Sequence, residues 1–184
     1  MTAPDPQYLL IEDLEGYTPH VARLVGMMNY TRLTTLWEIK GLTVEQLDHR
    51  IDDKANSIGA LLVHMAAIES WFQILTFEGR ELFKPEEYDR WSAAMELGDR
   101  ARTEIHGHDD AYYLDLLRSV RDKTLRGFRE RDDAWLHESR PFWWARGNHY
   151  FMWFHVFEDE LNHRGQIRLI KSRLPQALAV RGSA

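Results

Sequence analysis

Three side chains of types that bind divalent metals recur at one-turn intervals near the C-terminal end of the sequence. His155, Asp159 and His163 are separated by four residues each. Residues at positions i and i+4 of a helix lie on one face, so the Asp159 carboxylate and the His163 imidazole can bind the same ion. His64, much earlier in the sequence, is a candidate third ligand from another helix. Together, His64, Asp159 and His163 predict a metal centre.

Two imidazoles and one carboxylate suit Zn, Ni, Co, Mn or Fe(II). Three protein ligands leave coordination positions open, which is typical of catalytic sites. We therefore expect one divalent transition metal per chain, with Zn or Ni ahead of Fe, Mn and Co. A structural interpretation of the same residues also exists. His64 can be a hydrogen-bonded packing residue at the edge of a core, and Asp159 with His163 can be an ion pair on a helix surface.

Other side chains of these types lie near the predicted ligands or elsewhere in the sequence. His155 is the candidate for orienting a ligand or moving a proton, with a structural hydrogen bond as the alternative. Glu69 follows His64 by about one helical turn and could reach the site. His106 and His108 form an H-x-H pair within a polar connection, where metal binding is less expected than solvation.

Four long amphipathic segments must position these residues. Apolar side chains recur at helical spacing in residues 19–41, 57–79, 110–130 and 149–174. We predict an all-α fold, an up-down four-helix bundle that forms one domain over residues 1–184, with a long insertion at residues 80–109 between helices 2 and 3. Bundles build metal sites from inward side chains of facing helices, which is the arrangement that His64 and the Asp159–His163 pair need.

Three connections carry further expectations. In "LTVEQLDHR" after the first helix, Thr43 and Gln46 have the spacing of a capping box and predict a short helix. A second short helix is expected around 86–95, inside an insertion typical of a lid or a partner-facing segment. The stretch "DDAWLHESRPFWWARGNH" lacks clear strand alternation and predicts an irregular aromatic loop. Its aromatic residues, with those that follow up to Phe157, are expected to form core and the wall of a pocket.

The composition excludes several classes of protein. The net charge of −6, with basic residues scattered among acids, argues against a nucleic-acid-binding surface. No stretch approaches the roughly 20 apolar residues of a membrane span, and the N-terminal residues lack the pattern of a secretory signal, so we expect a cytoplasmic protein with no membrane partner. Cysteine is absent, so the chain offers neither a thiolate ligand nor a thiol nucleophile.

The sequence resembles the DinB-like superfamily of metal-binding four-helix bundles, which includes the bacillithiol and mycothiol S-transferases. The resemblance covers about residues 20–174 and rests on "NSIGALLVHMAAIESWFQ", which contains His64, and on "HVFEDELNHRGQI", which contains His163. The usual triad of the superfamily is one His on the second helix and an H-x3-H pair on the fourth. Asp159 occupies the middle position, where His is commoner, and the resemblance implies that it is a ligand as well.

The resemblance implies a metal-dependent thiol S-transferase, which conjugates a low-molecular-weight thiol to an electrophile. Because one fold hosts many activities, three alternatives stay open. They are a metal-dependent hydrolase that uses metal-bound water, a non-catalytic, stress-related metal-binding dimer, and an iron oxygenase with a 2-His-1-carboxylate site. The partners expected for the first function are a small-molecule thiol and an electrophile.

A homodimer is expected from the fourth helix. On a helical projection Trp153, Val156 and Ile167 lie away from its core stripe, among Glu160 and Arg164. Apolar residues on an otherwise outward face indicate a partner surface. The alternative is that the insertion or the aromatic loop covers them.

Overall fold

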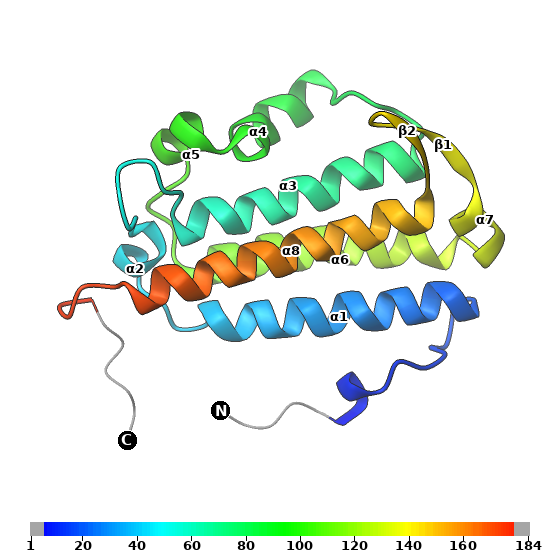
Figure 1. The fold of residues 1–184 in the computed structure, drawn as a ribbon, viewed down its shortest axis with the longest axis horizontal. Helices are drawn as coiled ribbons and strands as arrows, with labels where there is room; N and C mark the ends of the chain where they lie inside the picture. Colours follow the sequence, from blue (N-terminus) through cyan, green and yellow to red (C-terminus); the bar gives the residue numbers. More distant parts are fainter. Residues whose placement is uncertain (1–5, 179–184) are drawn as a thin grey trace.

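The computed structural model describes residues 6–178 of the chain. Four long helices dominate it, and shorter helices and one small hairpin connect them (Figure 1). The long helices are α1 (Pro19–Ile39), α3 (Ile58–Phe77), α6 (Asp110–Arg129) and α8 (His149–Ser172). The remaining elements are a 3-10 helix (Pro6–Leu9), α2 (Val44–Asp48), α4 (Pro85–Glu96), α5 (Gly98–Glu104), α7 (Asp133–His137), β1 (Ser139–Phe142) and β2 (Ala145–Asn148). The predicted all-α four-helix bundle with a long insertion is confirmed.

The four long helices pack so that α3 contacts α6 and α8, while α1 contacts α8 and α6. Neighbours α3 and α8 run antiparallel, as do α1 and α6 (Figure 1). The insertion carries the chain back along the whole length of α3, so α6 runs in the same direction as α3 (Figure 1). The alternating up-down order expected from the sequence is therefore wrong at α6, because the long insertion returns the chain to the end of the bundle where α3 begins. This arrangement places the middle of α8 directly against α3, which is the contact that the predicted metal centre requires.

Local sequence explains where the helices begin. Ser57 caps α3 by accepting a hydrogen bond from the Ala60 amide, and Asn148 caps α8 by accepting one from the Phe151 amide. The predicted capping box of Thr43 and Gln46 is confirmed at α2, with both reciprocal hydrogen bonds present.

The insertion folds over α3 rather than extending away from the bundle. Its helix α4 packs on α3, and Trp91 and Ala94 of α4 are buried there. By length and composition α3 could cross a membrane, contrary to the expectation that no segment approaches such a span. Its most apolar stretch is 89% buried within the described structure, as in the central helix of a folded core.

The aromatic stretch after α6 is more regular than the sequence predicts. It forms the short helix α7 and a two-stranded antiparallel hairpin, in which Phe142 pairs with Ala145 and Ser139 with Asn148. Strands of four residues are too short to establish a clear alternation, so the sequence pattern missed them. The hairpin lies at the end of the bundle where α8 begins (Figure 1).

The outward face assigned to the fourth helix is wrong. Trp153 and Ile167 are fully buried, and Val156 is 3% exposed. Neighbours on both sides, α1 and α3, cover α8, so its buried arc is wider than the single stripe assumed from the sequence. These residues therefore cannot support a dimer interface, and the apolar side chains that α8 does expose are Phe151, Phe154, Leu161 and Leu169.

Candidate metal centre

The structure brings His64, Asp159 and His163 together between α3 and α8. One potential ligand atom from each residue lies within 4.8 Å of the other two. The His64 Nε2 atom is 3.8 Å from Asp159 Oδ2, and His163 Nε2 is 3.4 Å from Asp159 Oδ1. The two imidazole rings meet edge to face with centroids 4.8 Å apart. The i, i+4 spacing on α8 thus places the side chains of Asp159 and His163 next to each other, as expected from the sequence.

The insertion orients one of these side chains. The His64 Nδ1 atom lies 2.8 Å from the backbone carbonyl oxygen of Ala94 on α4. A carbonyl can only accept a hydrogen bond, so Nδ1 is the donor and Nε2 is the ring nitrogen that faces Asp159. Metal-binding histidines characteristically donate their second ring nitrogen in this way. The acceptor is a backbone carbonyl, which every residue has, so the sequence could not predict this hydrogen bond.

Some polar atoms of the cluster lack a hydrogen-bond partner, as expected if the cluster binds a cation. Within residues 6–178, Asp159 Oδ2 and His163 Nδ1 are buried and have no hydrogen-bond partner. Burial would raise the pKa of Asp159, but His163 and His64 together hold that pKa well below its usual range. The carboxylate is therefore an anion in a sparsely hydrated position, where a positive ion would satisfy it. The donor set and these unpartnered atoms fit one divalent transition metal.

Three candidate ligands converge, and no other group of three His, Asp or Glu side chains with this geometry occurs in the described residues. His106 and His108 do not join such a group, and His108 instead stacks on Tyr112 with ring centroids 3.9 Å apart. A site with three protein ligands leaves room for an exogenous molecule beside the ion.

Glu69 does not reach the metal centre, because it belongs to a buried ionic cluster in the middle of the bundle. We call this cluster the charge quartet; each long helix contributes one member, and the members are Arg32, Glu69, Arg121 and Glu160. Arg32 donates to Glu69 at 2.9 Å and to Glu160 at 2.9 Å. Arg121 donates to Glu69 at 2.7 Å and lies 3.5 Å from Glu160. Two positive and two negative charges therefore balance within the core.

Further hydrogen bonds complete the charge quartet. The Arg32 and Arg121 guanidinium groups donate to the backbone carbonyls of Leu117 and Met28, each at 2.9 Å, and Thr124 donates to Glu69 at 2.6 Å. Burial alone would raise the pKa of Glu69, but the two arginines lower it to about 2. Buried charges are tolerated in a protein core when ion pairs and hydrogen bonds satisfy them in this way.

The charge quartet fixes the two helices that carry the predicted ligands. Glu160 follows Asp159 directly on α8, and Glu69 lies on α3 a little more than one turn after His64. Their ion pairs restrict rotation and sliding of both helices. A sequence signal of this cluster is the spacing of Arg32, which falls four residues after Met28 on the apolar face of α1.

His155 lies one turn before Asp159 on α8, at the edge of the aromatic hairpin. Its Nδ1 atom is 3.0 Å from a carboxylate oxygen of Glu158. Its ring centroid is 5.0 Å from that of Trp143 and 6.0 Å from that of Phe72. His155 is thus a carboxylate-oriented imidazole between the predicted ligands and an aromatic surface.

Comparison with known proteins agrees with the geometry. The family model described as mycothiol S-transferase matches residues 23–176, which include all four long helices except the first turn of α1. No curated protein matches the sequence. The matched region contains the His64, Asp159 and His163 cluster, and a match over most of the chain establishes membership. The chain belongs to the mycothiol S-transferase family, within the DinB-like superfamily.

Proposed function

We propose that the protein is a metal-dependent thiol S-transferase that conjugates a low-molecular-weight thiol to an electrophile. The observation that carries the proposal is the buried cluster of His64, Asp159 and His163, with its unpartnered carboxylate oxygen, in a chain of this family. The family supports the class of reaction, and the cluster supports its dependence on metal.

His64 through Nε2, Asp159 through its carboxylate and His163 through an imidazole nitrogen would hold one divalent metal ion, for which we propose Zn or Ni. When bound, such an ion acts as a Lewis acid that lowers the pKa of a thiol and favours the reactive thiolate at neutral pH. The Ala94 carbonyl keeps the His64 lone pair directed into the site.

The sulfur nucleophile comes from a cosubstrate, because the chain contains no cysteine. A sulfur–carbon bond forms, the thiol loses its proton, and the electrophile either releases a leaving group or takes up a proton after addition. We propose that His155 receives or returns this proton. Glu158 would accept a hydrogen bond from Nδ1 of His155, which leaves Nε2 able to take the proton.

Holding the electrophile beside the sulfur is the remaining task of the protein. Phe72 and Trp143 flank His155 with their rings and provide an apolar surface on the approach to Asp159. Such a surface excludes water, which would otherwise compete with the thiol for the electrophile.

The test compares metal-loaded and chelator-stripped protein across a panel of thiols that includes mycothiol and bacillithiol. Metal-dependent consumption of at least one thiol with an electrophile is expected, and the His64→Ala variant should lack it. If no thiol is consumed, while a simple ester or amide is cleaved in a metal-dependent way, the protein is a hydrolase and the proposal is wrong.

Three less specific expectations complete the proposal. We propose a cytoplasmic protein that acts on small molecules rather than nucleic acid, which the net charge of −6 supports. We also propose a homodimer, now through the exposed α8 residues Phe154, Leu161 and Leu169. Light scattering at micromolar concentration that detects only monomer would remove the dimer.

A further inference from the structure

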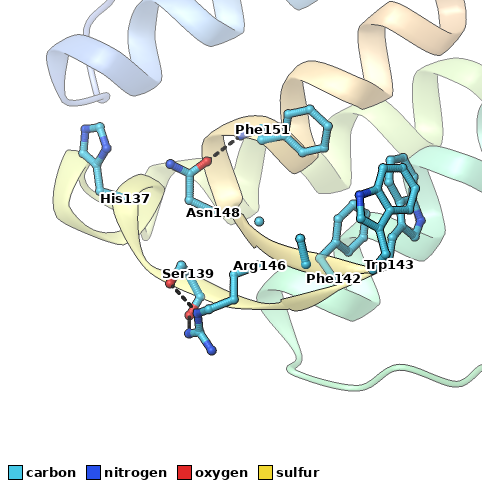
Figure 2. Close-up of a pocket in the computed structure, with 10 residues that line it drawn as sticks. His137, Ser139, Phe142, Trp143, Arg146, Asn148 and Phe151 are labelled. Carbon is cyan, nitrogen blue, oxygen red and sulfur yellow. Dashed lines mark hydrogen bonds between the residues drawn. The ribbon is translucent and has the colours of Figure 1, made fainter.

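A pocket of about 570 Å³ lies beside the hairpin, outside the predicted metal ligands. Phe142 and Trp143 lie at one end of it and His137 at the other, with Phe151 of α8 opposite the hairpin (Figure 2). This volume is that of a typical small-molecule site. We call the part lined by Phe142, Trp143 and Phe151 the aromatic end of the pocket.

The aromatic end is built from closely packed rings. Phe142 stacks on Trp143 with centroids 4.5 Å apart, and the Phe151 ring stands edge to face against Trp143 at 6.1 Å. Trp143 has a φ of 50°, a conformation that hairpin turns usually assign to Gly or Asn, so the indole is displayed at a conformational cost. Its side chain is 55% exposed. Strained backbone that holds an exposed aromatic ring is typical of a binding loop rather than of a packing element.

Charged side chains do not point into the aromatic end. Arg146 donates to the backbone oxygen of Ser139 at 2.6 Å and to its hydroxyl oxygen at 3.2 Å, at the base of the hairpin and away from the rings (Figure 2). Among the described residues, no Asp or Glu lines the pocket. An ionic group would lose its hydration there without gaining a partner, so the aromatic end favours a planar, uncharged group.

Three residues of α8 lead from the aromatic end to the predicted metal centre. Phe151, His155 and Asp159 are separated by four residues each, so they lie on one face of the helix, about 6 Å apart along its axis. The His155 ring is 6.4 Å from that of Phe151 and 5.0 Å from that of Trp143, measured between centroids. A ligand with its ring against Phe151 and Trp143 would therefore place its next group at His155 and extend toward Asp159.

The fate of the proton and of any leaving group distinguishes addition from displacement. A displacement releases an anion, and no cationic side chain of the described residues receives it at the aromatic end, because Arg146 is held at Ser139. In an addition the product takes up the proton that the thiol loses, so no ion remains. His155, with Nδ1 3.0 Å from Glu158 and Nε2 as its second ring nitrogen, can pass this proton. The pocket therefore favours an electrophile with an activated double bond.

We propose that the pocket binds an uncharged aryl vinyl ketone, with its ring against Trp143 and Phe151 and its vinyl group directed along α8. Resting on the proposed function, the inference names this class of molecule as the electrophile. The thiol sulfur forms a bond to the β-carbon, the carbon–carbon double bond opens, and its electron pair moves to the α-carbon and the carbonyl oxygen. The proton of the thiol passes through His155 to the α-carbon, so the product is a thioether and nothing is released.

The first test measures binding without turnover, with 2-naphthyl ethyl ketone, which lacks the double bond. Calorimetry with the metal-loaded full chain gives its affinity. Trp143→Ala and Phe151→Ala should each weaken binding about tenfold, because each removes one ring of the aromatic end. Arg146→Gln should leave the affinity unchanged, because the ketone is uncharged. Trp37→Ala on α1, which replaces an exposed indole outside the pocket, should also have no effect.

The second test uses 2-naphthyl vinyl ketone and the thiol that the protein consumes. The ethyl ketone should compete with the vinyl ketone but not with the thiol. Trp143→Ala should raise KM for the vinyl ketone about tenfold and leave KM for the thiol unchanged.

Equal affinity for the ethyl ketone in Trp143→Ala, Phe151→Ala and the unsubstituted protein would overturn the inference. So would Trp143-dependent binding to phosphatidylglycerol vesicles without binding of the ketone, since the hairpin would then be a membrane anchor. If the ketone binds as expected while no thiol is consumed, the proposed function fails and the pocket stands as a site for uncharged aryl ketones.

Discussion

The Nδ1 atom of His64 lies 2.8 Å from the carbonyl oxygen of Ala94. A residue of the bundle is therefore oriented by a helix of the insertion, and the position of α4 decides which nitrogen of the imidazole faces Asp159. The insertion thereby supports the predicted metal centre and also covers α3.

Trp91→Ala should lower metal affinity about tenfold, because the buried indole holds α4 against α3 three residues before Ala94. Tyr88→Ala, at an exposed position of the same helix, should leave affinity unchanged. Competition with a metal-binding dye measures both constants. Unaltered affinity in a folded Trp91→Ala variant would show that Ala94 does not position the ligand.

His163→Ala should lose most of the bound metal, whereas the unsubstituted protein should contain about one ion per chain. The variant removes one of the three ligand candidates and leaves only His64 beside the Asp159 carboxylate. His137→Ala, which replaces a histidine outside the cluster, is the matched control. Elemental analysis of chelator-free protein gives the occupancy, and full occupancy in His163→Ala would mean that the ligand set is wrong.

Glu69→Gln should destabilise the protein by about 3 kcal/mol at neutral pH, because two buried arginines lose a shared carboxylate. The pKa of Glu69 is lowered from 4.5 to about 2 in the folded protein. Its stabilisation is therefore present above about pH 4.5 and is lost as the pH falls toward 2. The difference in unfolding free energy between variant and parent should shrink across that window.

Urea denaturation of metal-free protein, from about pH 7 to the lowest pH at which both proteins fold, measures this difference. Glu104→Gln, at an exposed position of α5, should change the unfolding free energy by less than about 0.5 kcal/mol at every pH. A Glu69→Gln curve parallel to that of the parent would contradict the assigned ion pairs.

His155→Gln should keep its metal and lower kcat about 100-fold, with a much smaller change in KM, if the imidazole moves a proton. The pH dependence of kcat should also flatten in this variant. His106→Gln, at an exposed position of the insertion, controls for the loss of a histidine elsewhere. A variant with unaltered kcat would restrict His155 to its hydrogen bond with Glu158.

The sequence was sufficient to predict the features that depend on periodicity. Apolar spacing located the four long helices, and the i, i+4 relationship placed Asp159 beside His163. It was insufficient where tertiary contacts decide. The hydrogen bond to the Ala94 carbonyl involves the backbone, so no residue type predicts it. The sequence alone suggests that Glu160 is a surface residue, whereas in the structure Glu160 pairs with Arg32 and Arg121 in the core. The burial of Trp153 depends on two flanking helices, which one helical projection cannot reveal.

The charge quartet has a consequence for how the chain folds. Each long helix contributes one charge, so any assembly of three helices would enclose one unbalanced charge. Without α8, for example, Arg32 and Arg121 would share only Glu69. A buried unpaired charge costs several kcal/mol, so partly assembled bundles and bundles with exchanged helix order are disfavoured. The helix that supplies Glu160 also carries Asp159 and His163, so the docking of α8 that balances the charge quartet is the same step that brings the predicted metal ligands to His64.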